Sequence, residues 1–294
     1  MTAAVHAFCE DRAAAGRLAA ALRVPLRMIE LHTLPDGESL PRVVTGGAVA
    51  LLYRALDRPD EKVIPLLLAA DALRRAGARR VVLVAPYLPY LRQDAVFAPG
   101  QPLSRDVLGR VLGAAFDRVV TVEPHLHRTA DLTPVFGGTP VTALSAAELV
   151  AAHVGVRGDP LIAGPDAESA PWIGRIAERL GASSLVAAKR RDGDRAVGIE
   201  FPKGAAVAGR RVVLVDDILS TGATLACAIG ELRAAGARTI EVVAIHDLSR
   251  RGGPAGLRRA GADSVISTDS CGHRSNVIRL APLLATALSP ETDQ

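Results

Sequence analysis

The 294-residue chain contains few cysteines and few aromatic side chains. Its three cysteines show no CxxC spacing, and an odd count without a signal peptide indicates a reducing, cytoplasmic environment. No stretch reaches the roughly 20 apolar residues that a membrane span requires. No run of lysine and arginine with interleaved aromatic residues is present, so nucleic acid is not an expected partner.

The composition instead favours an α/β protein. Hydrophobic residues make up 49% of the chain and aromatic residues only 3%, which leaves a core dominated by alanine, valine and leucine. The chain is long enough for two domains with full cores. A formal net charge of +4 is mild and is compatible with anionic phosphate substrates.

A unit of helix, glycine and strand recurs along the chain. The helix ends at 73–79, 232–238 and 257–262 each contain a glycine and precede the expected strands 80–85, 239–245 and 264–267. Such alternation predicts parallel sheets flanked by helices. Turn-rich stretches at 136–140 and 157–160 bracket a boundary, so we predict two similar α/β domains, 1–148 and 149–294, with the last helix free to pack on the first domain. The polar tail 289–294 is expected to be frayed.

One segment predicts a phosphate site. The strand 211–215 runs into Asp216 and Asp217, and a hydroxyl-rich turn then leads into a helix. Backbone N–H groups and the helix dipole at such a turn attract phosphate, while the acids are placed to accept from sugar hydroxyls or to approach a metal. A sugar phosphate is therefore expected to bind at Asp216, Asp217, Ser220, Thr221, Gly222, Ala223 and Thr224. A buried strand with an Asp cap is the simpler alternative, but adjacent buried acids are costly without partners.

This segment resembles the phosphoribosyl pyrophosphate (PRPP) loop of the type I phosphoribosyltransferase superfamily. The superfamily includes transferases that consume PRPP together with a nitrogenous acceptor. It also includes the ribose-phosphate pyrophosphokinases, which make PRPP from ribose 5-phosphate and ATP. The loop alone does not distinguish these two kinds of enzyme.

Two motifs in the first half of the chain are similar to the pyrophosphokinases. Residues 34–38 look like the family's Phe-Pro-Asp-Gly-Glu segment, with a leucine in place of the phenylalanine. Residues 86–94 look like the signature Pro-Tyr-x-x-Tyr-x-Arg-Gln-Asp, for which transferases that bind no ATP have no equivalent. The continuation 97–104 resembles the archaeal branch. The resemblance implies that ATP is contacted by Leu34, Asp36, Glu38, Arg92, Gln93 and Asp94.

Three further matches follow in family order. His125 occupies the place of the family's histidine at the metal–nucleotide site, and Asp166 matches an aspartate near the same metal. Lys189 and Arg191 match the Lys-x-Arg that opens a mobile catalytic loop, which implies that they stabilise the charge of the reacting phosphates. Taken singly, these residues could be a structural histidine, a turn aspartate and a solvated basic turn. Their occurrence together implies a Mg²⁺-dependent enzyme.

The favoured function is that of a ribose-phosphate diphosphokinase, which transfers the β,γ-diphosphate of ATP to O1 of ribose 5-phosphate and gives PRPP and AMP. A phosphoribosyltransferase that uses PRPP and a catalytically silent regulatory subunit remain alternatives. Ala95 stands where the family has a basic residue, and Glu168 adds a carboxylate without an assigned role. The resemblance further implies two phosphoribosyltransferase-like domains and at least a homodimer. Donor preference and regulation by phosphate or ADP are left open.

Overall fold

The computed structural model describes residues 2–44, 47–126, 131–155, 159–192, 195–202, 206–249 and 252–292. For residues 189–192 and 195–197 only the course of the backbone is described. The chain divides into two compact units. The first comprises residues 1–144, 270–272 and 280–294, and the second comprises residues 145–269 and 273–279.

The first unit is built on a parallel sheet of six strands within the described part of the chain. In spatial order, the strands are β2 (Leu26–Met28), β1 (Ala3–Ala7), β5 (Val49–Tyr53), β6 (Arg80–Val84), β7 (Arg118–Val122) and β8 (Val141–Leu144). Residues of β1 and β5 are buried throughout. Burial on both faces is the expected environment of a parallel sheet that helices cover.

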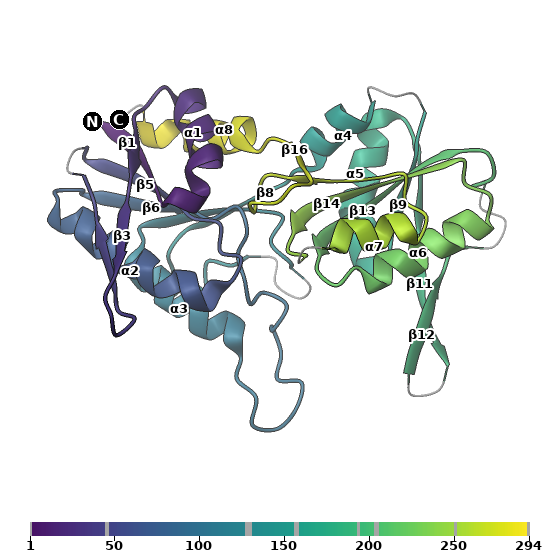
Figure 1. The fold of residues 1–294 in the computed structure, drawn as a ribbon, viewed down its shortest axis with the longest axis horizontal. Coiled ribbons are helices and arrows are strands. Elements are labelled where there is room, and N and C mark those ends of the chain that lie inside the picture. The colour runs from purple at the N-terminus through teal and green to yellow at the C-terminus, as the bar shows by residue number, and fades with distance from the viewer. Residues whose placement is uncertain are drawn as a thin grey trace. The chain divides into compact units, whose positions relative to one another are not determined.

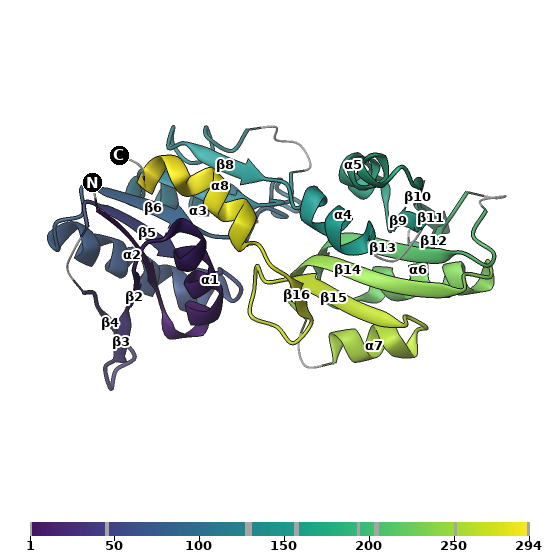
Figure 2. The same cartoon turned by 90° about the horizontal axis from the view of Figure 1, so that it is seen from above.

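Helices lie on the faces of this sheet. They are α1 (Arg12–Leu22), α2 (Pro59–Arg75), α3 (Ser104–Ala115) and α8 (Ala281–Thr292). The apolar cluster that joins the sheet to α2 and α3 includes Leu52, Leu66, Leu83 and Leu112, all fully buried. The carboxyl-terminal helix α8 packs beside α1, as Figures 1 and 2 show.

The second unit repeats this plan. The six strands of its main sheet in the described residues, again all parallel, are β10 (Ser183–Val186), β9 (Leu161–Gly164), β13 (Arg211–Leu219), β14 (Thr239–Asp247), β15 (Ser264–Thr268) and β16 (Asn276–Ile278). The helices are α4 (Ala147–Gly155), α5 (Ala170–Leu180), α6 (Ala223–Ala234) and α7 (Gly253–Arg259). The core on the side of α6 includes Leu214, Ile229 and Val242.

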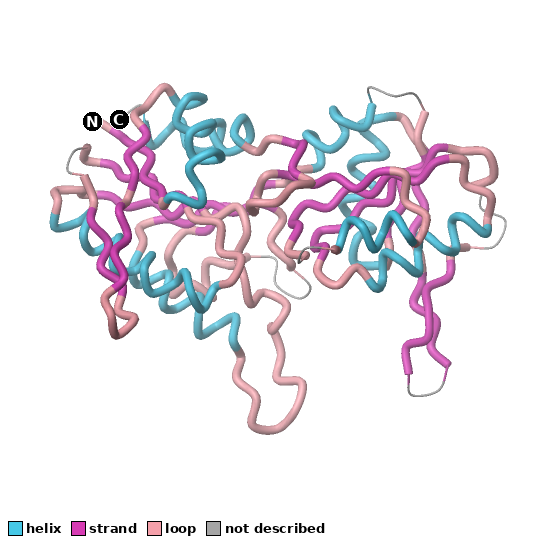
Figure 3. The backbone as a smooth tube through the Cα atoms, in the orientation of Figure 1, coloured by secondary structure: helices cyan, strands magenta, loops and turns pink. Residues whose placement is uncertain are grey.

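The two units share one strand order. In each sheet the second strand along the chain lies at the edge, the first lies beside it, and the remaining four follow in sequence. Each unit also inserts an antiparallel hairpin at the same point of its chain: β3 (Glu30–Thr33) with β4 (Ser39–Arg42), and β11 (Ala188–Asp192) with β12 (Arg195–Glu200). Each hairpin extends away from the sheet of its own unit (Figure 3). The predicted fold class, two similar α/β domains with parallel sheets flanked by helices, is confirmed.

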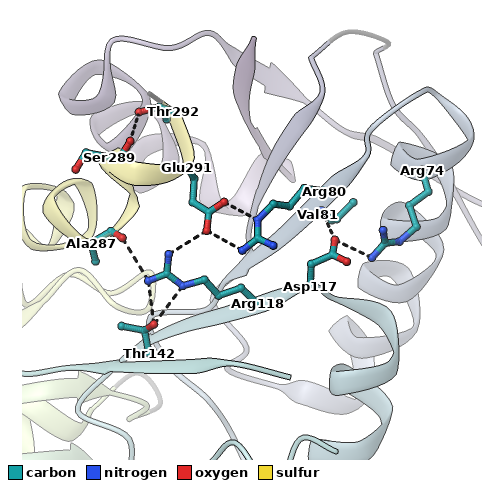
Figure 4. Close-up of polar contacts among 10 residues, drawn as sticks. All are labelled: Arg74, Arg80, Val81, Asp117, Arg118, Thr142, Ala287, Ser289, Glu291 and Thr292. Carbon is teal, nitrogen blue, oxygen red and sulfur yellow. Dashed lines mark hydrogen bonds and ion pairs between the residues drawn. The ribbon is translucent and has the colours of Figure 1, made fainter. Parts of the chain in front are cut away.

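The carboxyl-terminal tail differs from the expectation. Residues 289–292 continue helix α8 instead of fraying, because the Glu291 side chain is 7% exposed and is held by two arginines of the first sheet (Figure 4). A polar sequence at a chain end did not reveal partners that lie far away in the sequence. Within the described residues, no helix combines the length and the apolar character required to cross a bilayer.

Candidate functional site

The predicted phosphate site lies where strand β13 passes into helix α6. The strand continues through Asp216 and Asp217 to Leu219, and α6 begins at Ala223. The side chains of Ser220, Thr221, Ala223 and Thr224 are exposed, so the turn presents its hydroxyls to solvent, and the N–H of Ala223, the first residue of α6, donates to Oγ1 of Thr221 at 3.4 Å. The first turn of a helix has N–H groups without intrahelical partners, which is the physical basis of anion binding there.

Gly222 makes this turn possible. Its φ of 78° lies in the left-handed region, and it serves as the N-cap of α6. A Cβ atom at this position would lie 3.2 Å from a methyl group of Leu257 and 3.4 Å from one of Leu219. A side chain at this position would therefore press on Leu257 and Leu219, and the left-handed backbone at the start of α6 favours glycine.

Three carboxylates lie near one another at the carboxyl edge of this sheet. Asp216 and Asp217 are at the end of β13, and Asp166 follows the neighbouring strand β9. Burial, together with the negative charges of Asp217 and Asp166, raises the pKa of the Asp216 carboxyl well above its ordinary value. The Asp217 N–H donates to Oδ1 of Asp216 at 3.0 Å. The arrangement favours a proton, a cation or a sugar hydroxyl at this point.

Asp166 is held by its own turn. Its Oδ1 accepts from the N–H of Glu168 at 3.2 Å, and its backbone oxygen accepts from the Ser169 hydroxyl at 2.6 Å. It forms the N-cap of a short 3-10 helix, η2 (Ala167–Ser169), that leads into α5. Glu168, two residues further along the chain, is exposed. The structure thus places Asp166 beside the pair on β13, as expected for strand ends in an open α/β sheet.

The donor set fits a hard divalent cation that is only loosely held. Carboxylate oxygens are the protein ligands that Mg²⁺ prefers, and Mg²⁺ usually keeps several waters and binds through one or two carboxylates plus substrate phosphates. In the part of the chain that is described, no group of three or more His, Cys, Asp or Glu residues is placed to hold a metal ion by itself. The other predicted metal residue, His125, belongs to the first unit, whereas Asp166 belongs to the second.

The basic pair of the second unit lies on a hairpin. Lys189 and Arg191 belong to strand β11, where they pair with Ile199 and Ala196 of β12, and the register shifts between Arg190 and Arg191. Strand β11 begins two residues after β10 ends. The side chains of Lys189 and Arg191 lie outside the described residues, so only the position of their backbone is established.

The nucleotide motif of the first unit follows strand β6. Arg92 and Gln93 are exposed and Asp94 is half-buried. The Gln93 side chain accepts a hydrogen bond from the Ser104 hydroxyl at 2.6 Å, which ties the motif to the start of α3. His125, half-buried, follows the adjacent parallel strand β7. Because the carboxyl ends of adjacent parallel strands meet at one edge, the structure brings these segments to the same edge of the sheet.

The remaining predicted nucleotide residues form the tip of the β3–β4 hairpin. The Leu34 N–H donates to the Glu38 backbone oxygen at 2.8 Å, and Oδ1 of Asp36 accepts from the Glu38 N–H at 3.2 Å. Asp36 and Glu38 are exposed, and Leu34 is half-buried. The hairpin packs against α2.

A buried polar cluster in the second unit was not predicted from the sequence. Asp247, at the end of β14, accepts hydrogen bonds from Ser249 and Ser275 and contacts His273. No short motif signals it, because residues 273–275 reach Asp247 only through the packing of β14 and β15. A carboxylate two residues after the apolar run that ends at Ile245 was the one available hint.

Comparison with known proteins places these observations in a family. A model of the N-terminal domain of ribose phosphate pyrophosphokinase matches residues 5–115, and a model of the phosphoribosyl transferase domain matches residues 143–278. The chain is 32% identical over 279 residues to a ribose-phosphate pyrophosphokinase of Methanopyrus kandleri, which covers 92% of this chain and 94% of that one. It is 30% identical over 267 residues to a protein of the same name from Pyrococcus furiosus, with coverages of 90% and 94%.

A solved structure shows the same architecture over the full length. The crystal structure of phosphoribosylpyrophosphate synthetase from Mycobacterium smegmatis superposes with a TM-score of 0.84 at 25% identity and covers 100% of this chain and 99% of that one. The family predicted from the motifs and the prediction that the protein is an enzyme are confirmed. The chain belongs to the ribose-phosphate pyrophosphokinase family.

Proposed function

We propose that this protein transfers the β,γ-diphosphate of ATP to O1 of ribose 5-phosphate and releases AMP and PRPP. Atoms balance in one displacement: O1 of the sugar bonds to the β-phosphorus, the bond from the β-phosphorus to the oxygen shared with the α-phosphate breaks so that this oxygen leaves with AMP, and the O1–H proton passes to solvent. Phosphoryl-type transfer requires in-line positioning and positive charge around the phosphorus rather than a covalent intermediate. The family membership supports this reaction.

In this proposal the sugar phosphate binds at the start of α6. The 5-phosphate accepts from the N–H groups and hydroxyls of Ser220 to Thr224, all at the exposed turn. Asp216 and Asp217 hold the ribose hydroxyls. The position of this pair near the carboxyl end of β13, directly before the turn, carries this assignment, and the raised pKa of the half-buried Asp216 carboxyl beside Asp217 and Asp166 is consistent with a hydroxyl donor or a cation there.

The nucleotide is assigned to the first unit. Arg92 and Gln93 would contact the phosphates and the base. Their exposure, and their position at the same sheet edge as His125, support this assignment. Asp94 orients this loop, and the hairpin residues Asp36 and Glu38 accept from adenine or ribose. Leu34 offers an aliphatic surface to the base.

Charge stabilisation is assigned to Lys189 and Arg191 of strand β11, whose cations would neutralise the phosphates as the displacement proceeds. His125 and Asp166 would hold the divalent cation, which we propose is Mg²⁺ and which supplies further positive charge and aligns the nucleotide phosphates when bound. The domain boundary near residue 148 is part of the same proposal, with each domain contributing one substrate site.

A product assay tests the reaction. Purified protein is incubated with ribose 5-phosphate, ATP and Mg²⁺, and AMP and PRPP are separated by chromatography, with Lys189→Ala as a control. Equal amounts of AMP and PRPP that vanish in the control are expected. A folded protein that binds ribose 5-phosphate but forms no product with any nucleotide would overturn the proposal. PRPP consumption with a base would instead identify a transferase.

We further propose that the functional form is a homodimer or a higher homo-oligomer, in which a second copy covers the β3–β4 hairpin and the outer face of α2. Leu40 of the hairpin and Ile64 of α2 are 57% and 58% exposed, and Leu68 lies one turn beyond Ile64 on the same face. Leu31 and Leu40 are not cross-strand partners, so the hairpin exposes an apolar side chain on each face. An arm that exposes a leucine on each face suits insertion into a partner.

The mass in solution tests the assembly. Light scattering should give at least a dimer, and Leu40→Asp combined with Ile64→Glu should lower the mass to that of one chain. Val277→Glu, at an exposed apolar residue of the second unit, is the matched control and should leave the mass unchanged. A wild-type mass of one chain at every concentration would overturn this assembly.

A further inference from the structure

The Asp247 carboxylate at the end of β14 is removed from water and surrounded by donors. Its side chain is 0% exposed. Oδ1 accepts from the N–H of Ser249 at 3.0 Å and from its hydroxyl at 2.6 Å, and Oδ2 accepts from the Ser275 hydroxyl at 2.6 Å. Nδ1 of His273 lies 2.9 Å from Oδ2. The three hydrogen bonds from Ser249 and Ser275 compensate much of the cost of burying this group, so it has a strong preference for one arrangement of its neighbours.

This cluster adjoins the strand side of the phosphate turn. Asp247 pairs directly with Leu219, the residue before Ser220, and the N–H of the next residue, Leu248, donates to the Leu219 oxygen at 2.8 Å. Parallel pairing of β13 with β14 therefore continues to the very start of the turn. Contacts that position the end of β14 therefore also position Leu219, where the turn begins.

The same cluster reaches the helix side of the turn. A Cβ atom at Gly253, the first residue of α7, would lie 2.2 Å from the Ser249 hydroxyl, so the start of α7 rests directly on the side chain that Asp247 orders. One helical turn later, Leu257 of α7 lies against Gly222, the N-cap of α6. Asp247 is therefore connected to both ends of the turn. It pairs with Leu219 at the strand end, and it reaches the helix end through Ser249 and then Leu257 of α7.

Residues 273–275 complete the enclosure. The hydroxyl of Ser275 also lies 2.7 Å from that of Ser267 on β15, and the Ser267 N–H donates to the Ser275 oxygen at 2.8 Å. His273 and Ser275 are therefore anchored to β15 at the same time as they contact Asp247. The carboxylate thus links the end of β14 to β15 through Ser275 and to the start of α7 through Ser249.

We infer that Asp247, with Ser249, His273 and Ser275, is a positioning group that holds the turn 220–224 in the conformation that binds the 5-phosphate of ribose 5-phosphate. This inference rests on the proposed function. Asp247 touches no substrate in it and acts only through the backbone of the turn. Loss of the group should therefore weaken sugar phosphate binding and leave the nucleotide site, which belongs to the other unit, unaffected.

Steady-state kinetics and calorimetry on the full chain test the inference. Asp247→Asn, Ser249→Ala and Ser275→Ala should raise KM for ribose 5-phosphate by about 10-fold or more, with KM for ATP within about 2-fold of wild type. Titration calorimetry with ribose 5-phosphate alone should show the same loss of affinity. The two serine variants remove one hydroxyl each, so they decide the question if Asp247→Asn does not fold.

Glu241→Gln is the matched control. Glu241 is a buried carboxylate at the other end of the same strand, where it accepts from Arg211 at 3.2 Å. Its loss should lower thermal stability without changing KM for ribose 5-phosphate. Unchanged ribose 5-phosphate affinity in the folded serine variants, or an equal loss in Glu241→Gln, would overturn the positioning role. A wild-type protein that binds no ribose 5-phosphate would overturn the proposed function, and this inference with it.

Discussion

Arg80 donates two hydrogen bonds to the carboxylate of Glu291, from Nε at 2.6 Å and from Nη2 at 2.9 Å, although 211 residues separate them (Figure 4). Arg118 adds a third from Nη1 at 3.0 Å. The two arginines are the first residues of β6 and β7, so helix α8 is fastened to the amino edge of the first sheet. The predicted nucleotide and metal residues Arg92, Gln93 and His125 follow the opposite, carboxyl ends of the same two strands, so the attachment of α8 is separate from them.

Glu291→Gln is expected to destabilise the first unit by about 1 to 3 kcal/mol, because two arginines lose a charged acceptor that is 7% exposed. Urea denaturation at pH 7 measures this. The contrasting variant is Glu148→Gln, whose pair with Arg179 is exposed on both sides and should contribute no more than about 0.5 kcal/mol. Equal effects of the two changes would show that the Glu291 contacts do not stabilise the fold.

The free energy of unfolding should decrease as the pH is lowered, because of His6, a buried residue of β1. Burial and the charge of Arg27 lower its pKa from 6.5 to about 4. The folded protein therefore binds fewer protons than the unfolded chain between these values. The contribution of neutral His6 to the free energy of unfolding is fully present above pH 6.5. It decreases by about 2 to 3 kcal/mol as the pH falls toward 4, because the unfolded chain then binds a proton that the folded protein does not. In the variant His6→Leu, the urea midpoint should change less with pH between 6.5 and 4 than it does in the wild type. An equal dependence of the midpoint on pH in the two proteins would contradict the assignment.

Gly222→Ala should impair binding of ribose 5-phosphate more than it impairs folding. The added methyl would occupy a left-handed residue and press on Leu257 and Leu219, at a cost of about 1 to 2 kcal/mol that the turn relieves by shifting. Gly181→Ala is the control, since Gly181 is also left-handed at φ 61° but has no atom within 4 Å of the new Cβ. Calorimetric titration should show loss of affinity only for Gly222→Ala.

Lys189→Ala should lower kcat by about 100-fold or more while KM for either substrate changes by less than about 3-fold, because the lysine is assigned to charge that develops during transfer. Arg238→Ala removes an exposed cation just before β14, at the amino edge of the same sheet, and should leave kcat unchanged. An unaltered kcat in Lys189→Ala would remove this residue from the mechanism.

The local elements were readable from the chain. The apolar run 211–215, the acids that follow it and the start of a helix near 223 are all consequences of residue type and spacing, and the structure has them in that order. The helix, glycine and strand units at 73–85 and 232–245 likewise became α2 with β6 and α6 with β14. Short-range rules suffice there because each element is decided by neighbours within one or two turns.

The matched hairpins were not specified in advance. The family resemblance implied a mobile loop that opens at Lys189 and Arg191, and the hairpin β3–β4 was not expected, because Ser39–Arg42 contains a proline and lacks apolar alternation. Its strands form where α2 packs against β4. That packing partner lies further along the chain and is not visible in the strands themselves.

By itself, the sequence determined the family motifs, the parallel α/β plan and the position of the phosphate turn, since these depend on residue types a few positions apart. The tertiary structure alone decided that Glu291 meets Arg80 and Arg118, and that His273 and Ser275 meet Asp247. Such contacts join residues tens or hundreds of positions apart. They form only when the sheets and helices have packed, and the burial that makes them strong exists only then.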